Sequence, residues 1–280
     1  MKKNKILLAT ALVAVLFGCK KQESAAITEV ASDGCRECLT EKYVSPSGQT
    51  GILENGRFDG REFTYTRVDG LNVLEGDILL TDQQLGKIPS TEGTITTLTT
   101  RYWPNKTVYY RFATGLDQAT KDKFITASNE WKNKLGINFV VRTTQSNYIN
   151  VIKGSGCYSS IGMVGGAQDL SLAAGCSSGN GIHEIGHALG MYHEHTRTDR
   201  DTYVRVNTAN IASGYSHNFT KCSSCTANGT LDFGSIMMYD SYAFSSNGLP
   251  TIVRTNGTTF GSQRSALSAN DIAIVRSKYP

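Results

Sequence analysis

Three scarcities narrow what this chain of 280 residues can do. No run of basic residues follows the N-terminal segment, so the formal net charge of +4 is spread out and nucleic-acid binding has no electrostatic footprint. Proline occurs 5 times and glycine 28 times, which indicates tight turns rather than rigid linkers. Histidine occurs 5 times, and four of these residues lie between positions 183 and 195. We therefore expect the chemistry of the chain to centre on that stretch.

The stretch Gly181 to Asp201 begins with a metal-binding pattern. In a helix, His183 and His187 project from one face a single turn apart, so both imidazoles can bind one zinc ion. Glu184 follows the first histidine and can act on a water molecule at the metal. Apolar residues recur on a different face, which the helix can bury: Ile182, Ile185 and Leu189.

The continuation of this pattern supplies a third ligand. Gly190 lets the chain leave the helix, because glycine adopts left-handed or tight conformations without a side-chain clash. His193 follows just past that turn and completes the extended zincin signature HExxHxxGxxH. A cluster of surface histidines, the alternative, explains neither the glycine nor the third histidine. The sequence therefore predicts one catalytic Zn²⁺ ion held by His183, His187 and His193.

The residues from the third histidine onward resemble a known family. Positions 193–201, HEHTRTDRD, resemble the astacin branch of the metzincin metalloproteases. Matrix and snake-venom metalloproteases share the three histidines but lack this tail. The resemblance implies an α+β zincin fold with two lobes. A twisted mixed sheet and the active-site helix would form the N-terminal lobe, 91–193, and an irregular C-terminal lobe, 194–280, would end in a helix.

Local patterns predict elements in the order that this family has them. The alternation in TVYYRF predicts a strand at 107–112, and Asp117 precedes a helical apolar stripe that Gly136 ends. Trp131 on that stripe is expected in the core. Further elements are predicted as strands at 137–143, 148–153, 161–164 and 169–173, and as a helix from Ser268 to Tyr279 with Asp271 in its cap. An exposed strand edge in this region would let an extended peptide substrate add itself to the sheet.

The segment Ser235 to Tyr239, SIMMY, is similar to the S-x-M-H-Y turn of the family. The resemblance implies that Met237 lies beneath the zinc ion. It also implies that Tyr239 is a further ligand in the resting enzyme and swings to hydrogen-bond the oxyanion during catalysis. Met238 replaces the usual histidine, which is no zinc ligand, so this departure affects a local contact more than catalysis. Two adjacent methionines are otherwise typical of a core.

The charged residues after the third histidine have two interpretations. They form either a solvated cluster or, as the resemblance implies, ion pairs at the junction of the lobes: Arg197, Asp199, Arg200 and Asp201. The resemblance gives Glu194 a more specific role, which is to receive the new N-terminal ammonium group once the propeptide is cut. Such a buried carboxylate needs a partner, because an unpaired one is costly to desolvate.

The N-terminus is predicted to be an export signal, 1–18. An apolar run from Ile6 to Phe17 follows three lysines and is too short to serve comfortably as a permanent membrane anchor. The run ends in LFGC, which resembles a bacterial lipoprotein cleavage box with Cys19 as the acylated first residue. Ordinary cleavage nearby is the alternative. Lipid chains on Cys19 would tether the precursor to a membrane surface in the cell envelope.

Six cysteines remain when Cys19 is set aside, and they fall into three neighbouring pairs. Two pairs are C-x-x-C motifs, which also occur in zinc knuckles and redox sites, but export favours local disulfides. The third pair flanks a glycine-rich segment, and the resemblance implies a bridge beside the active site. The expected disulfides are therefore Cys35–Cys38, Cys222–Cys225 and Cys157–Cys176.

A second bridge that is usual in the family is missing from this sequence. Ile137 occupies a position where a cysteine would be expected, and residues 277–280 contain none. The C-terminal helix is therefore expected to be held by packing alone.

Residues 19–90 are expected to form a propeptide, polar at first and then turn-rich. Within it, LEGDI at 74–78 resembles the F-x-G-D motif of the family's propeptides, with leucine in place of phenylalanine. Gly76 would let the backbone approach the cleft, and Asp77 would occupy the zinc position that water needs. An ordinary turn between two strands is one alternative. A thiolate latch from one of the two propeptide cysteines is another.

These features together predict an exported zinc metalloendopeptidase that is made as a latent precursor and secreted or kept in the cell envelope. Its catalytic domain, 91–280, would begin after cleavage between Lys87 and Thr94, with Glu184 as general base and Tyr239 beside it. We expect a monomer that acts on extended proteins or peptides and binds no nucleic acid. The alternatives are an inactive lipid-anchored zinc-binding or adhesion protein and a metzincin of another branch.

Overall fold

The computed structural model describes residues 41–87, 101–222, 225 and 229–280, all of which belong to one compact unit, Ser32–Pro280. Several predicted features lie outside the described residues: the signal 1–18, Cys19, Cys35, Cys38 and the cleavage region after Lys87. Within the described part, no helix is long and apolar enough to cross a membrane.

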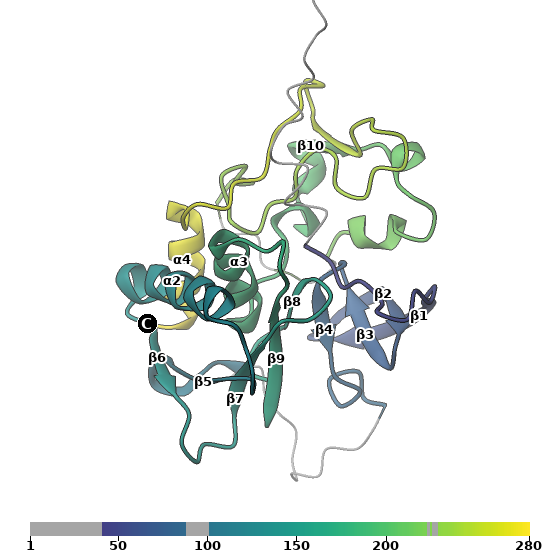
Figure 1. Cartoon of the computed structure of the whole chain (residues 1–280). Helices are drawn as coiled ribbons and strands as arrows, with labels where there is room; N and C mark the ends of the chain where they lie inside the picture. Colours follow the sequence, from purple (N-terminus) through teal and green to yellow (C-terminus); the bar gives the residue numbers. More distant parts are fainter. Residues whose placement is uncertain (1–40, 88–100, 223–224, 226–228) are drawn as a thin grey trace, which may run out of the picture. The chain divides into compact units, whose positions relative to one another are not determined.

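A mixed sheet of nine strands runs through the described residues (Figure 1). In order across the sheet, the strands are β1 (Ile52–Phe58), β2 (Arg61–Val68), β3 (Leu71–Leu74), β4 (Ile78–Leu80), β8 (Cys157–Ser160), β9 (Ala167–Leu172), β7 (Tyr148–Ile152), β5 (Thr107–Phe112) and β6 (Asn138–Val141). Strands β1 to β4 pair as successive antiparallel neighbours. The pairs β9–β7, β7–β5 and β5–β6 are parallel, and β8–β9 is antiparallel.

Three α-helices and several short 3₁₀-helices complete the described secondary structure. The α-helices are α2 (Gln118–Leu135), α3 (Ser178–Ala188) and α4 (Ala269–Lys278). The 3₁₀-helices are η2 (Pro104–Lys106), η3 (Glu194–Thr196), η4 (Arg200–Thr202), η5 (Thr208–Asn210) and η6 (Ser216–Phe219). Between α3 and α4 the chain is largely irregular, apart from four of these 3₁₀-helices and a two-stranded sheet of β10 (Val204–Val206) and β11 (Ile252–Arg254). The predicted α+β architecture is confirmed.

Helix α2 forms where its sequence pattern predicts it. The Asp117 side chain accepts a hydrogen bond from the Thr120 N–H at 3.0 Å, and Gly136 closes the helix in the left-handed region. Its apolar stripe is buried, and the indole N–H of Trp131 donates to the carbonyl of Ile182 in α3 at 3.0 Å. Since this bond satisfies the one polar atom of a fully buried ring, Trp131 fixes α3 against α2.

One predicted strand is wrong. The chain is extended at β8, just before the predicted strand at 161–164, which itself has no strand structure. The Gly162 N–H donates to the carbonyl of His187 at 2.8 Å, and the Met163 N–H donates to the carbonyl of Arg101 at 2.7 Å. These backbone donors bind the end of α3 and a neighbouring loop, so they cannot join a sheet ladder.

A substrate-binding strand edge was expected near 161–173, and in this region the edge of β8 is already paired. Strand β4 of the N-terminal segment lies parallel to β8, with Ile78 opposite Ser159 and Leu79 opposite Ser160. The described N-terminal residues are therefore more ordered than the predicted turn-rich propeptide, because strands β1 to β4 extend the sheet. Backbone pairing of this kind is the mode that was expected for an extended peptide substrate.

Helix α4 begins with the predicted capping box of Ser268 and Asp271. The buried Asp271 carboxylate also accepts hydrogen bonds from the Ser235 hydroxyl at 2.6 Å and from the Ile236 N–H at 2.9 Å. Beyond the helix, the Tyr279 hydroxyl donates to the carbonyl of Leu189 at 3.3 Å. The expectation that packing alone holds this helix is wrong. Buried hydrogen bonds from Ser235 and Ile236 to Asp271 also fix its first turn.

Candidate metal centre

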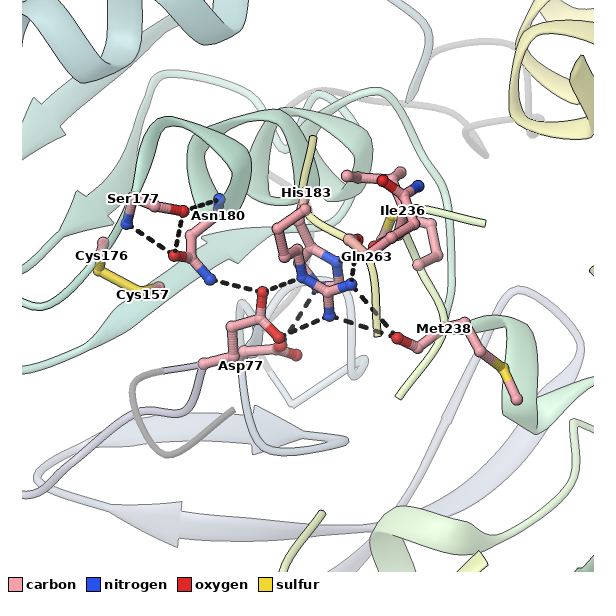
Figure 2. A network of polar contacts seen from close by, with 12 residues as sticks. Asp77, Cys157, Cys176, Ser177, Asn180, His183, Ile236, Met238 and Gln263 are labelled. Carbon is pink, nitrogen blue, oxygen red and sulfur yellow. Dashed lines mark hydrogen bonds and ion pairs between the residues drawn. A yellow bond between two sulfur atoms is a disulfide. The ribbon is translucent and has the colours of Figure 1, made fainter. Parts of the chain in front are cut away.

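Helix α3 carries two of the predicted ligands and begins with a reciprocal cap. The Asn180 N–H donates to the Ser177 hydroxyl at 3.1 Å, and the Ser177 N–H donates to the Asn180 side-chain oxygen at 2.6 Å (Figure 2). The disulfide between Cys157 and Cys176 joins β8 to the residue just before this cap. The first turn of α3 is therefore fixed by both a covalent bond and a cap.

The structure brings four potential metal ligands together: Asp77, His183, His187 and His193, whose ligand atoms all lie within 4.8 Å of one another. The Oδ2 atom of Asp77 lies 3.4 Å from His183 Nε2 and 3.3 Å from His193 Nε2, and its Oδ1 atom lies 3.6 Å from His187 Nε2. The four side chains are buried. This is the one such group found among the residues that the structure describes.

Hydrogen bonds on the far side of each imidazole aim its Nε2 atom at the cluster. His183 Nδ1 lies 2.7 Å from the carbonyl oxygen of Ile236, and His187 Nδ1 lies 2.7 Å from that of Met191. His193 Nδ1 lies 2.9 Å from a carboxylate oxygen of Glu75. When Nδ1 carries the proton and donates it in a hydrogen bond to an oxygen, Nε2 of the neutral ring keeps its lone pair. This tautomer of histidine can bind a metal through Nε2.

These residues fit a single zinc ion. Although they are buried, neither carboxylate oxygen of Asp77 nor Nε2 of His193 has a hydrogen-bond partner among the described residues. The Nε2 atoms of His183 and His187 also converge to 3.1 Å. Buried polar atoms without partners are costly, and a cation bound by three imidazoles and one carboxylate would satisfy all of them.

Asp77 reaches the histidines on a tight turn between β3 and β4. Glu75 and Gly76 both adopt left-handed conformations, with φ of +51° and +87°. A Cβ atom at Gly76 would lie 2.6 Å from the ring of Phe244, so a larger residue would clash. Burial opposes ionisation of Asp77, but the charge of His193 and the closeness of the other two imidazoles outweigh it and hold its pKa well below the ordinary value.

Glu184 is fully buried beside the cluster. Its two carboxylate oxygens have no hydrogen-bond partner among the described residues. Burial, together with the negative charges of Asp77 and Glu41, raises its pKa well above the ordinary value of 4.5. A carboxylate whose ionised form is disfavoured binds a proton readily, which suits a general base.

The SIMMY segment contacts α3 through Met237 as well as through the Ile236 carbonyl. A Cβ atom at Gly186 would lie 2.8 Å from the sulfur of Met237, so the glycine allows the thioether to approach the helix backbone. Met238, at the position where the family has a histidine, packs instead in an apolar cluster of the C-terminal part: Val204, Leu231, Ile252 and Phe260.

Tyr239 bonds to the N-terminal segment in this structure. Its hydroxyl donates to the backbone carbonyl of Glu75. Its ring stacks on His195, with centroids 3.9 Å apart, and lies 4.5 Å from the ring of His193. The phenol therefore lies beside the histidine cluster, and its hydroxyl is hydrogen-bonded to the turn that carries Asp77.

Glu194 already has partners. Its carboxylate accepts a hydrogen bond from the Asp232 N–H at 2.9 Å and lies 3.3 Å from the Arg197 guanidinium. Burial raises its pKa to about 7 despite these bonds. Arg197 also pairs with Asp199 at 2.8 Å, and Arg200 pairs with its neighbour Asp201 at 3.1 Å. The charged tail thus consists of ion pairs, and Arg197 and Arg200 are mostly buried.

The predictions from the sequence missed two buried charged pairs that involve the N-terminal segment. Glu41 lies buried against Arg264, and its carboxylate also accepts a hydrogen bond from the Asn180 side chain at 2.6 Å. The buried carboxylate of Glu75 pairs with Arg61. Proximity to Asp77 was a signal for Glu75, whereas nothing in the sequence singled out Glu41, which lies 223 residues from its partner.

The second C-x-x-C pair, Cys222 and Cys225, forms a local disulfide. It lies in the loop after η6, where the Cys222 N–H donates to the carbonyl of Thr196 at 2.6 Å. No metal group that includes these two cysteines occurs in the described part of the chain.

Comparison with known proteins agrees with this geometry. The family model described as Astacin, a family of peptidases, matches residues 95–280. Zinc metalloproteinase nas-31 of Caenorhabditis elegans is 38% identical over an alignment of 208 residues that covers 66% of this chain and 33% of the nematode protein. Astacin-like metalloprotease toxin 1 of the spider Loxosceles intermedia is 37% identical over 183 residues, 64% of this chain and 67% of the toxin.

A solved structure is similar as well. High choriolytic enzyme 1, a hatching enzyme zinc-protease of the medaka fish Oryzias latipes, has a TM-score of 0.62 and 33% sequence identity. The match covers 67% of this chain and 98% of the fish protein. The chain spans about a third of the length of its nematode relative.

Proposed function

We propose that this protein is a zinc-dependent endopeptidase made as a latent precursor. The chain belongs to the astacin family of zinc metalloproteases. The observation that carries this proposal is the cluster of three histidines and Asp77, in which the carboxylate comes from the segment preceding the matched domain. That segment, 19–90, would be the propeptide, and 91–280 would be the catalytic domain.

The catalytic chemistry divides among a few side chains. His183, His187 and His193 would hold the zinc ion, which supplies Lewis-acid activation of a water molecule and of the scissile carbonyl. Glu184 accepts the proton of the attacking water and returns it to the leaving amine. Tyr239, once its hydroxyl is released from the carbonyl of Glu75, donates a hydrogen bond to the oxygen that gains charge in the transition state.

The N-terminal segment would keep the precursor latent because it occupies three positions that catalysis needs. Asp77 takes the position beside the three imidazoles, Glu75 takes the hydroxyl of Tyr239, and β4 takes the edge of β8 that an extended substrate would need. Cleavage in 87–94 would remove all three contacts together. The new N-terminal ammonium would then have Glu194 as its expected acceptor.

Export and anchoring are part of the same proposal. The segment 1–18 would direct the chain out of the cytoplasm, and Cys19 would carry lipid until the catalytic domain is released as a monomer. Both disulfides in the described residues suit an oxidising compartment. Mass spectrometry of the processed protein tests lipidation and the cleavage point in one experiment.

The test of the main proposal is a casein-digestion assay on the purified precursor before and after limited proteolysis. We expect activity only after the segment is removed, and we expect a zinc chelator to abolish it. If the zinc-loaded, processed protein cleaves neither casein nor extended peptides, it is instead the inactive zinc-binding or adhesion protein.

A further inference from the structure

The third histidine differs from the other two in the source of its Nδ1 partner. The partners of His183 and His187 are backbone carbonyls of residues 236 and 191, which remain after cleavage. The partner of His193 is the side chain of Glu75, which belongs to the N-terminal segment. Removal of the segment therefore deletes the outer hydrogen bond of one ligand and leaves the other two intact.

Glu75 is held rigidly in this position. Its other carboxylate oxygen pairs with Arg61 of β2, and both side chains are at most 2% exposed. The guanidinium of Arg61 lies 4.9 Å from the ring centroid of Tyr192, the residue just before His193. Arg61, Glu75 and the Tyr192–His193 pair thus form one buried contact unit between the segment and the metal ligand.

A carboxylate in this position affects metal binding through the imidazole. By accepting a hydrogen bond from the Nδ1–H group, Glu75 fixes the tautomer and orientation of the ring and makes Nε2 a better electron donor. Loss of such an outer partner typically lowers metal affinity by about 10–100-fold. The same turn also supplies Asp77 as a direct ligand, so the two carboxylates act on the metal in different ways.

We propose that Glu75 is a positioning residue for His193, through which the N-terminal segment makes the precursor hold zinc more tightly than the processed domain does. The segment then serves metal retention during export as well as latency. This inference rests on the proposed zinc site, but it does not require that the processed protein hydrolyse peptides.

The experiment measures zinc release from the intact, zinc-loaded precursor into excess chelating dye. We expect Glu75→Gln to release zinc about 10–100-fold faster than wild type. The matched control is Glu62→Gln, which neutralises an exposed carboxylate of the same segment and should release zinc at the wild-type rate.

A double variant separates positioning from a merely structural ion pair. Glu75→Gln leaves the buried Arg61 without its carboxylate, so loosening of the segment could also speed release. Arg61→Met combined with Glu75→Gln removes both charges. If Glu75 positions His193, the double variant still releases zinc fast, whereas a structural role predicts a return to the control rate.

Zinc release from the double variant within about twofold of the control therefore overturns the inference, whatever the single variant does. The casein assay on the processed wild-type protein is independent of this measurement. If the processed protein is inactive and both Glu75 variants release zinc fast, the proposed peptidase function is refuted, whereas the role of Glu75 is supported.

Discussion

The two parts of the chain that meet at the metal centre hold their functional groups by different means. In residues 101–280, His183 and His187 are fixed by backbone carbonyls, and α3 is fixed by a cap and a disulfide. In residues 41–87, the groups that reach the site are carboxylate side chains on a turn and at the start of the segment.

The two parts of the chain also have separate apolar cores. The largest buried cluster contains residues of α2, α3, α4 and the parallel strands, and none of its members comes from 41–87. The N-terminal segment has two small clusters of its own, in which Ile161 and Tyr158 are the buried members from the later part of the chain. The difference teaches that the segment contributes no buried residue to the main core, as the proposed removal of a propeptide would require.

The largest expected effect concerns the part that does the chemistry. Replacing Glu184 by Gln should lower the kcat of the processed enzyme by roughly 10²–10⁴-fold, because the amide cannot accept the proton of water. Zinc content should stay at one ion per chain, since all three histidines remain. Peptide hydrolysis and metal analysis on the same sample check both statements, and full activity in the variant would refute the role of Glu184.

The next effect concerns the turn that blocks the site. Replacing Asp77 by Ala removes a charged contact worth about 1.5–3 kcal/mol, so activity of the uncleaved precursor should rise roughly 10–100-fold above its background. Glu62→Ala is the matched control in the same segment. A variant precursor that stays latent would contradict the aspartate latch, and replacing Cys35 and Cys38 by Ser would then test the thiolate alternative.

A comparable effect concerns the buried pair of Glu41 and Arg264. Glu41→Gln should weaken docking of the segment by about 3 kcal/mol, because it breaks a buried ion pair. The variant precursor should therefore lose its segment faster to a protease that cuts exposed chain. An unchanged cleavage rate would show that the pair does not anchor the segment.

The same pair predicts a pH dependence. Burial opposes ionisation of Glu41, but the Arg264 charge holds its pKa below the ordinary 4.5. A depressed pKa means that the pair stabilises the folded precursor above pH 4.5, and that this stabilisation is lost as the pH falls through the lower value. The stability difference between wild type and Glu41→Gln, measured by urea unfolding, should therefore shrink on acidification and remain constant between about pH 6 and 8.

The smallest effect concerns a cap far from the N-terminal segment. Ser268→Ala removes the hydroxyl that accepts from the Asp271 N–H at 3.0 Å, so unfolding of the processed domain should become easier by about 1 kcal/mol. Docking of the segment should not change. A variant that loosens the segment as well would show that the two parts are less independent than their separate cores indicate.

The local features of the sequence predicted much of this molecule. The ends of α2 and α4 follow from Asp117, Gly136 and the Ser268–Asp271 box, because capping depends on residues a few positions apart. The spacing of His183 and His187 likewise predicted a shared face, since helical geometry fixes it. The strand predicted at 161–164 failed because the N–H groups of Gly162 and Met163 bind the end of α3 and the carbonyl of Arg101 rather than a neighbouring strand.

By itself, the sequence predicted the candidate zinc ligands, the candidate general base, the candidate latch and the family, because each depends on spacing within a short stretch. Only the tertiary structure decided that β4 covers the edge of β8, that Glu75 partners His193, and that Glu41 meets Arg264. The last two pairs join residues that lie 118 and 223 positions apart. No periodicity or motif predicts contacts between residues so far apart in the sequence, because these contacts arise from the packing of separate elements.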